Sequence, residues 1–194
     1  ACWASLMSTQ AFPIVNVDLG GLSSKKAIQH FLEHRPSERW VLLGEHAAQS
    51  VDQLWTAWIQ ATRNELRGCM VARSIDAEFL RYLAGTHHIS EAFARAGLQS
   101  DQSSAWVLCL PTAEGVENDL GHVQPIVQGT QAFSDHLEGF LESLGWPTTS
   151  SNVSFSIEGS QILGIDVQGW EKGREFESLI AHVLMADDQS SSHR

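Results

Sequence analysis

Histidines, cysteines and carboxylates are the side chains of this 194-residue chain that could carry chemistry. His87 and His88 are adjacent, and neighbouring residues on a helix or strand point apart. No carboxylate or cysteine lies at a chelating offset from them, so the pair indicates an exposed polar loop rather than a metal site. Cys2, Cys69 and Cys109 are far apart and lack CxxC spacing, which argues against a zinc site and against a disulfide framework. The absence of a disulfide framework favours a reducing compartment.

Motifs for phosphate binding and for nucleophilic catalysis are missing from the sequence, which has no GxGxxG, no GK[ST] and no GxSxG. A small hydrolase could still be built on His136 with Asp135, or on His182 with Asp187 or Asp188. Pairs of this kind arise by coincidence in many sequences. We therefore predict no catalytic residue, no metal and no cofactor, and keep a hydrolase as an alternative.

Composition predicts one globular domain, because 43% of the residues are hydrophobic and 18% are charged. The formal net charge of -11 argues against a general nucleic-acid binder, so any contact with RNA must use a local group of basic residues. No apolar run is long enough to span a bilayer, and residues 1–6 lack the features of a signal peptide. We expect a soluble cytoplasmic protein with a flexible extension at residues 1–10.

Strands and helices are predicted to alternate, which favours an α/β (α+β) domain at residues 11–186 with a mixed β-sheet flanked by helices. A helix begins at Ser23 or Ser24 and ends before Pro36, and Gly97 has the place of a C′ glycine. Residues 112–129 are predicted to be a loop and residues 187–194 a disordered tail. The predicted strands are residues 12–19, 40–44, 75–84, 106–110, 153–157 and 162–167, and the other predicted helices are about 45–67, 89–96, 133–144 and 175–186.

Two of these helices carry wide apolar stripes. Burial of each large side chain contributes roughly 1.5–3 kcal/mol, so we expect stripes this wide to cover both the core and a partner. The alternative is that all of these residues belong to the core. The stripes are Val51, Leu54, Trp55, Trp58 and Ile59 in the first helix and Phe176, Leu179, Ile180, Val183 and Leu184 in the last.

A central block carries a more specific pattern: ARSIDAEFL at residues 72–80, Gly85, HISEAF at 88–93 and AGL at 96–98. It resembles the PRPK-binding protein family, the kinase-binding accessory subunit of the KEOPS (EKC) complex. The resemblance extends to residues 40–67, 106–110 and 176–185. Residues 112–160 have no close counterpart and are predicted to be a lineage-specific elaboration.

This resemblance implies a mixed sheet flanked by helices and no catalytic activity. It also implies binding of the small atypical kinase/ATPase of the complex, which in turn contacts the threonylcarbamoyl transferase subunit. The complex makes threonylcarbamoyladenosine in tRNA, and archaeal members of the family resemble proteins that hold the tRNA 3′ end. A eukaryotic member would also be nuclear, and an adaptor of the same fold with a different partner is an alternative.

The interface residues are predicted from apolar surface and from basic charge. Glu78 is expected to form a buried structural pair with Arg73. Each arginine could instead pair with Glu65, Asp76 or Glu78. The predicted kinase contacts are Leu54, Trp55, Leu179, Val183 and Leu184, and the predicted tRNA contacts are Arg63, Arg67, Arg73, Arg81, His87 and His88.

Overall fold

The computed structural model describes residues 11–114, 124–125, 127–167 and 170–188. The predicted extension at residues 1–10 and residues 189–194 of the predicted tail lie outside the described residues. Asp187 and Asp188, the first two residues of that tail, are described, and Asp187 forms an ion pair with Arg81.

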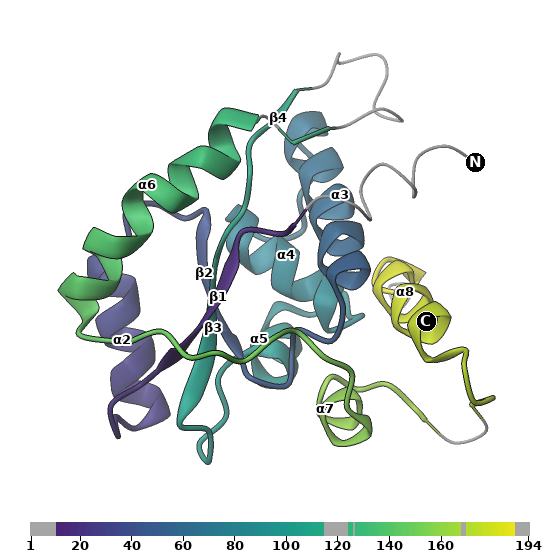
Figure 1. Cartoon of the computed structure of the whole chain (residues 1–194). Helices are drawn as coiled ribbons and strands as arrows, with labels where there is room; N and C mark the ends of the chain where they lie inside the picture. Colours follow the sequence, from purple (N-terminus) through teal and green to yellow (C-terminus); the bar gives the residue numbers. More distant parts are fainter. Residues whose placement is uncertain (1–10, 115–123, 126, 168–169, 189–194) are drawn as a thin grey trace.

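A three-stranded sheet with helices on both faces forms the centre of the molecule (Figure 1). Its strands are β1 (Ile14–Asp18), β2 (Trp40–Gly44) and β3 (Ser104–Cys109), in the order β1-β3-β2. Both pairings are antiparallel, so the prediction of a mixed sheet is wrong. The predicted class, a sheet flanked by helices in an α/β (α+β) domain, is confirmed. Within the predicted 112–129 loop, β4 (Ala113–Glu114) and β5 (Gln124–Pro125) pair to form a two-stranded antiparallel ribbon.

Residues alternate between two cores along each strand, because successive strand side chains point to opposite faces. Val41 and Leu43 belong to the core that includes α3 (Val51–Arg67), α4 (Ile75–Leu83) and α5 (Ile89–Ala96). Trp40 belongs to the core under α2 (Ser24–His34) and α6 (Val127–Leu144). The sheet is therefore covered on both faces.

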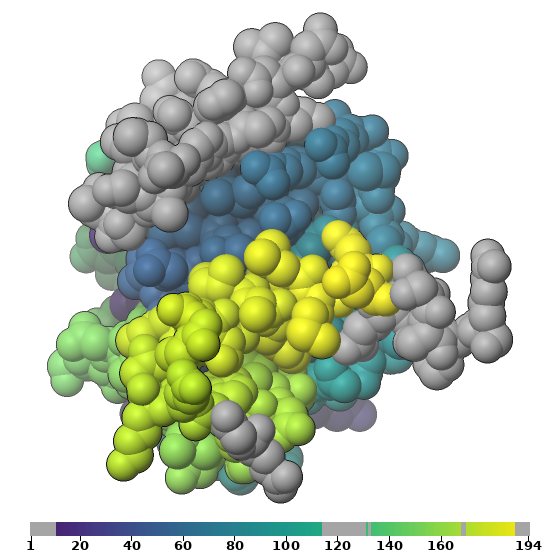
Figure 2. Space-filling view, turned by 90° about the vertical axis from the view of Figure 1, so that its right-hand side faces the viewer, coloured from purple at the N-terminus to yellow at the C-terminus, as the bar shows by residue number. Residues whose placement is uncertain are grey.

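The last helix, α8 (Glu175–Leu184), forms an outer layer on the α3 side. Figure 2 shows it in yellow, lying across the blue α3 and above the yellow-green segment that contains α7 (Ile157–Ile162). Leu179 and Val183 join α8 to the core of α3 and α4. No helix in the described part of the chain has both the length and the apolar character needed to cross a bilayer.

Residues 75–84 form α4, whereas the sequence predicted a strand. All nine residues of α4 are buried, so no exposed polar face reveals a period of 3.6 in the sequence. The strands predicted at 153–157 and 162–167 are also wrong, because α7 occupies part of this region. Its N-cap, Ser156, accepts a hydrogen bond from the backbone N–H of Gly159.

The remaining elements agree with the predictions, apart from their ends. α3 begins at Val51 rather than at residue 45, because Ser50 and Gln53 form a capping box there. Gly97 ends α5 but has a φ of -72°, so it is no left-handed C′ glycine. A Cβ at this position would lie 2.4 Å from the Phe93 carbonyl oxygen, and this close approach explains the glycine.

Candidate functional site

The predicted kinase contacts are mostly core residues. Leu54, Leu179 and Val183 are fully buried, and Trp55 is 2% exposed. α3 packs against both α4 and α8, and the Phe12 ring packs edge to face on Trp55 at 4.7 Å, so Leu54 and Trp55 are covered within the chain. These four assignments are corrected on that ground. Leu184 remains at the surface, 48% exposed.

The outer face of α8, defined here as Phe176, Leu184 and Met185, carries the apolar surface that its own core does not cover. Phe176, Leu184 and Met185 are each about half exposed, while Leu179 and Val183 are fully buried in the core. α8 therefore has both buried and exposed apolar residues, and the expectation that its exposed ones cover a partner stays a prediction.

The predicted tRNA contacts are spread over different environments. Arg67, Arg73 and His88 are exposed, whereas Arg63 and His87 are half-buried. Arg63 and Arg67 lie one turn apart near the end of α3, and burial, followed by the charge of Arg67, lowers the pKa of Arg63. Their contact with tRNA stays a prediction.

Arg81 is fully buried and cannot contact tRNA, which corrects that prediction. Its guanidinium lies 2.8 Å from a carboxylate oxygen of Glu78 and 3.0 Å from one of Asp187. Buried arginines need partners of this kind because an unpaired charge is costly inside a protein. Arg81 therefore ties α4 to the residues that follow α8.

Glu78 also has a structural role. Its ion-pair partner is Arg81, whereas the prediction named Arg73. The carboxylate also accepts hydrogen bonds from the Asn64 side chain and the Ala72 backbone N–H, each at 2.8 Å. Burial alone would raise the pKa of Glu78, but the hydrogen bonds from Arg81, Ala72 and Asn64 outweigh it and lower the pKa.

The histidine and aspartate pairs do not form a recognisable catalytic arrangement. His182 is buried, which lowers its pKa, and Asp187 is hydrogen-bonded to the Tyr82 hydroxyl at 2.8 Å as well as paired with Arg81. Asp135 accepts a hydrogen bond from Gln131, and His136 is exposed. Among the described residues, no group of three His, Cys, Asp or Glu side chains could hold a metal ion.

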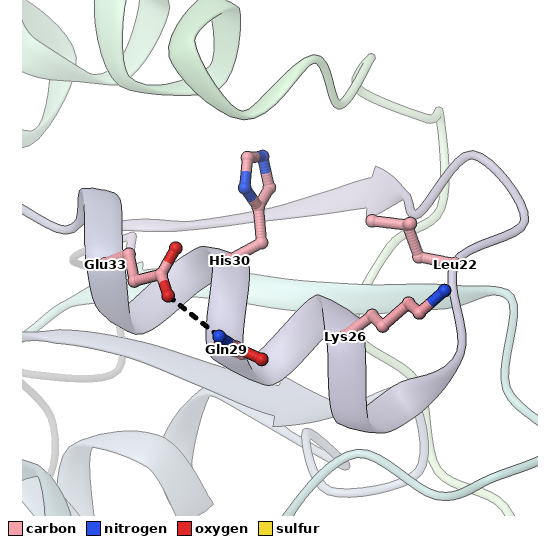
Figure 3. A pocket seen from close by; sticks show the side chains of 5 residues that line it. All are labelled: Leu22, Lys26, Gln29, His30 and Glu33. Carbon is pink, nitrogen blue, oxygen red and sulfur yellow. Dashed lines mark hydrogen bonds between the residues drawn. The ribbon is translucent and has the colours of Figure 1, made fainter.

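One hollow lies along α2 and is lined largely by that helix (Figure 3). Gln29 donates a hydrogen bond to Glu33 there, and His30 contacts the Leu144 carbonyl oxygen at 2.9 Å. The Gln29, His30 and Glu33 side chains are thus paired with one another or with backbone. They do not converge on a position where a substrate atom could react.

A narrower cleft of about 120 Å³ follows the outer edge of β2, and we call it the edge cleft. α2 forms one wall, α4 and α5 form the other, and Val41 and Leu42 line its floor. Ile28, Leu32 and Phe93 form an apolar rim on the two walls, with Leu32 50% and Phe93 49% exposed. Exposed apolar surface gathered around a concavity is typical of a binding site.

The sequence did not predict the edge cleft, because Ile28 and Leu32 belong to the same apolar stripe of the sequence as Ala27 and Phe31. In the structure Ala27 and Phe31 face the core of α2, and Ile28 and Leu32 lie one position further around the helix. A weak signal was present: α2 has four apolar residues in its stripe, and a small helix over one edge of a sheet can bury only part of it.

The fold and its surfaces define a helix-covered α/β protein whose distinctive features are apolar contact surfaces. The sequence matches the family described as kinase binding protein CGI-121 over residues 23–144, from the start of α2 to the end of α6. The match covers more than half of the chain, so the chain belongs to this family and the predicted resemblance is confirmed. A search of curated proteins found no match.

Proposed function

We propose that this protein is the kinase-binding accessory subunit of a KEOPS complex, where it supports the atypical kinase/ATPase subunit during threonylcarbamoyladenosine synthesis in tRNA. The family match carries this proposal, because members of the family are kinase-binding proteins. The arrangement of the site supports it, since the described residues offer exposed apolar surfaces rather than converging reactive groups.

Two surfaces are available to the kinase. The outer face of α8 retains Leu184 from the predicted contacts, and the rim of the edge cleft adds Ile28, Leu32 and Phe93. An interface needs a packed apolar centre with a few large anchors, and each surface offers such residues. The acidic chain also favours a basic partner face, because opposite net charges accelerate association.

Co-expression with the kinase subunit of the same organism, followed by size-exclusion chromatography, tests the proposal. We expect the two chains to elute as one complex and tRNA threonylcarbamoylation in the reconstituted system to increase when the protein is added. Chains that elute separately, together with an unchanged modification rate, would contradict it. Capture of another protein in place of the kinase would support the alternative of an adaptor with a different partner.

Direct binding of tRNA is a further part of the proposal and depends on Arg63, Arg67 and Arg73. These arginines lie at and just beyond the end of α3, and replacing Arg67 and Arg73 with glutamate removes exposed positive charge. We expect the double variant to bind tRNA more weakly and with a smaller salt dependence, because each phosphate contact contributes roughly one unit to the slope. Equal slopes for both proteins would remove these residues from tRNA binding.

A further inference from the structure

β2 is an edge strand, and only some of its outward-facing backbone N–H and C=O groups form hydrogen bonds. Leu110 N–H donates to Arg39 C=O, so residues 39, 41 and 43 turn their backbone groups toward β3, and residues 40, 42 and 44 turn theirs outward. Trp40 is satisfied on that outer side, because its N–H donates to Ser37 C=O and its carbonyl accepts from Arg35.

Leu42 presents the next outward pair of backbone groups, and they face the edge cleft that this residue lines. In the described part of the chain, neither its outward N–H nor its outward C=O takes part in a hydrogen bond. An unpaired N–H and C=O on an edge strand is a template for another extended chain.

The helices around Leu42 determine which chain could pair with it. Arg35 closes one end of the edge cleft through its ion pair with Asp76 at 2.8 Å, and Gly97 lies against Gly44 at the other end. The edge cleft is a space of about 120 Å³ with walls on both sides, which favours a single extended segment over the edge of a second sheet flanked by its own helices. Alternate side chains of such a segment point to opposite walls.

Asp76 adds a second polar feature to the edge cleft. It is 8% exposed, and its Oδ2 pairs with Arg35, while its Oδ1 has no hydrogen-bond partner among the described residues. A buried carboxylate oxygen without a donor is costly, so a segment that brings an N–H group to this oxygen would gain affinity.

We infer that the edge cleft is the kinase-binding site, and that the kinase inserts an extended segment that pairs with the backbone of Leu42. This inference rests on the proposed function. The segment carries apolar side chains at alternate positions, one against Ile28 and Leu32 on α2 and the next against Phe93 on α5. The edge cleft lies wholly within residues 23–144, whereas the outer face of α8 lies beyond the part of the chain that matches the kinase-binding family.

Three charge variants separate the two surfaces. Leu32→Glu and Phe93→Glu alter the edge cleft, and Leu184→Glu alters the outer face of α8 with a similarly exposed leucine. Each variant is co-expressed with the kinase, its affinity is measured by titration calorimetry, and its melting curve is recorded. We expect about tenfold or greater loss of affinity for the two edge-cleft variants, because a charge in an apolar anchor site is strongly unfavourable, and little change for Leu184→Glu.

Amide hydrogen exchange at Leu42 tests the backbone pairing itself. We expect this amide to exchange at least about tenfold more slowly in the kinase complex than in the free protein, because pairing with another strand protects the N–H. A kinase complex that leaves the Leu42 amide unprotected would overturn strand pairing even if the rim variants bind weakly.

The outcomes distinguish the inference from the proposed function. Wild-type protein that forms no complex with the kinase overturns the proposed function, and the inference with it. A wild-type complex that tolerates Leu32→Glu and Phe93→Glu but is lost in Leu184→Glu places the kinase on α8, which overturns the inference and keeps the proposed function.

Discussion

The buried Glu78, Arg81 and Tyr82 and the partly exposed Asp187 form a cluster that holds the segment following α8. Glu78 and Arg81 are one turn apart on α4, and Asp187 reaches them from beyond α8. Burial, together with the hydrogen bond to Asp187, raises the pKa of Tyr82 to about 12, so its hydroxyl stays protonated and donates to that carboxylate. The cluster joins α4 to the residues that follow α8.

Replacing Arg81 with alanine should destabilise the protein by about 3–5 kcal/mol, because it leaves the Glu78 carboxylate buried without its cation. Urea unfolding measures this loss. Arg73→Ala is the control, since Arg73 is exposed and lies just before α4. Substitutions of exposed residues usually change stability by about 0.5 kcal/mol or less. Equal midpoints for the two variants would show that the cluster contributes no net stability.

At the scale of the helices, the contact between α8 and the end of α4 depends on a glycine. Gly85 follows α4 with a φ of +59°, and a Cβ there would lie 2.6 Å from the His182 ring and 2.7 Å from its backbone oxygen. α8 therefore approaches the chain as closely as it does because position 85 has no side chain. Gly68, which ends α3 with a φ of +65°, has no atom within 4 Å of such a Cβ.

These two glycines predict different costs for the same substitution. Gly68→Ala should lose roughly 1–2 kcal/mol, the penalty of a left-handed backbone for alanine. Gly85→Ala has the same backbone penalty and in addition displaces α8, so we expect a larger loss and faster amide exchange in residues 175–184. Thermal unfolding and hydrogen exchange measure the two effects. An α8 that exchanges equally slowly in both variants would show that this close approach is not required.

At this scale the sequence predicts best where an element has a polar face. The helix at residues 89–96 was predicted with its observed bounds, because its apolar residues alternate with exposed ones at helical spacing. α4 was predicted as a strand because tertiary burial on every side removed that alternation. The edge cleft could not be predicted, since it depends on the distance between α2 and α5, which are more than fifty residues apart in the chain.

The whole molecule is a layered structure in which α8 covers the outside of α3. Leu179 and Val183 are fully buried in this layer, so the core of α3 and α4 is completed only by the last helix. Of the three α8 residues predicted to contact a partner, Leu179 and Val183 lie on its buried side and only Leu184 is exposed. The sequence spacing of the apolar residues of α8 did not distinguish its buried side from its exposed side.

Ending the chain at Gly173, which removes α8, should destabilise the whole protein. Leu179 and Val183 each contribute about 1.5–3 kcal/mol by burial, a large share of the roughly 5–15 kcal/mol that stabilises a domain. We expect a lower urea midpoint and binding of a hydrophobic dye to the uncovered core. A truncated chain with the midpoint of the full-length protein would show that α8 is an accessory layer.

The strand order has a consequence for how the chain acquires its structure during synthesis. β1 and β2 both pair with β3 and not with each other, and β3 begins at Ser104. Until Ser104–Cys109 has been synthesised, β1 and β2 therefore lack the strand that joins them. The apolar faces of β1 and β2 stay uncovered until β3 is synthesised. Long-range strand pairing of this kind slows folding and leaves nascent chains dependent on chaperones.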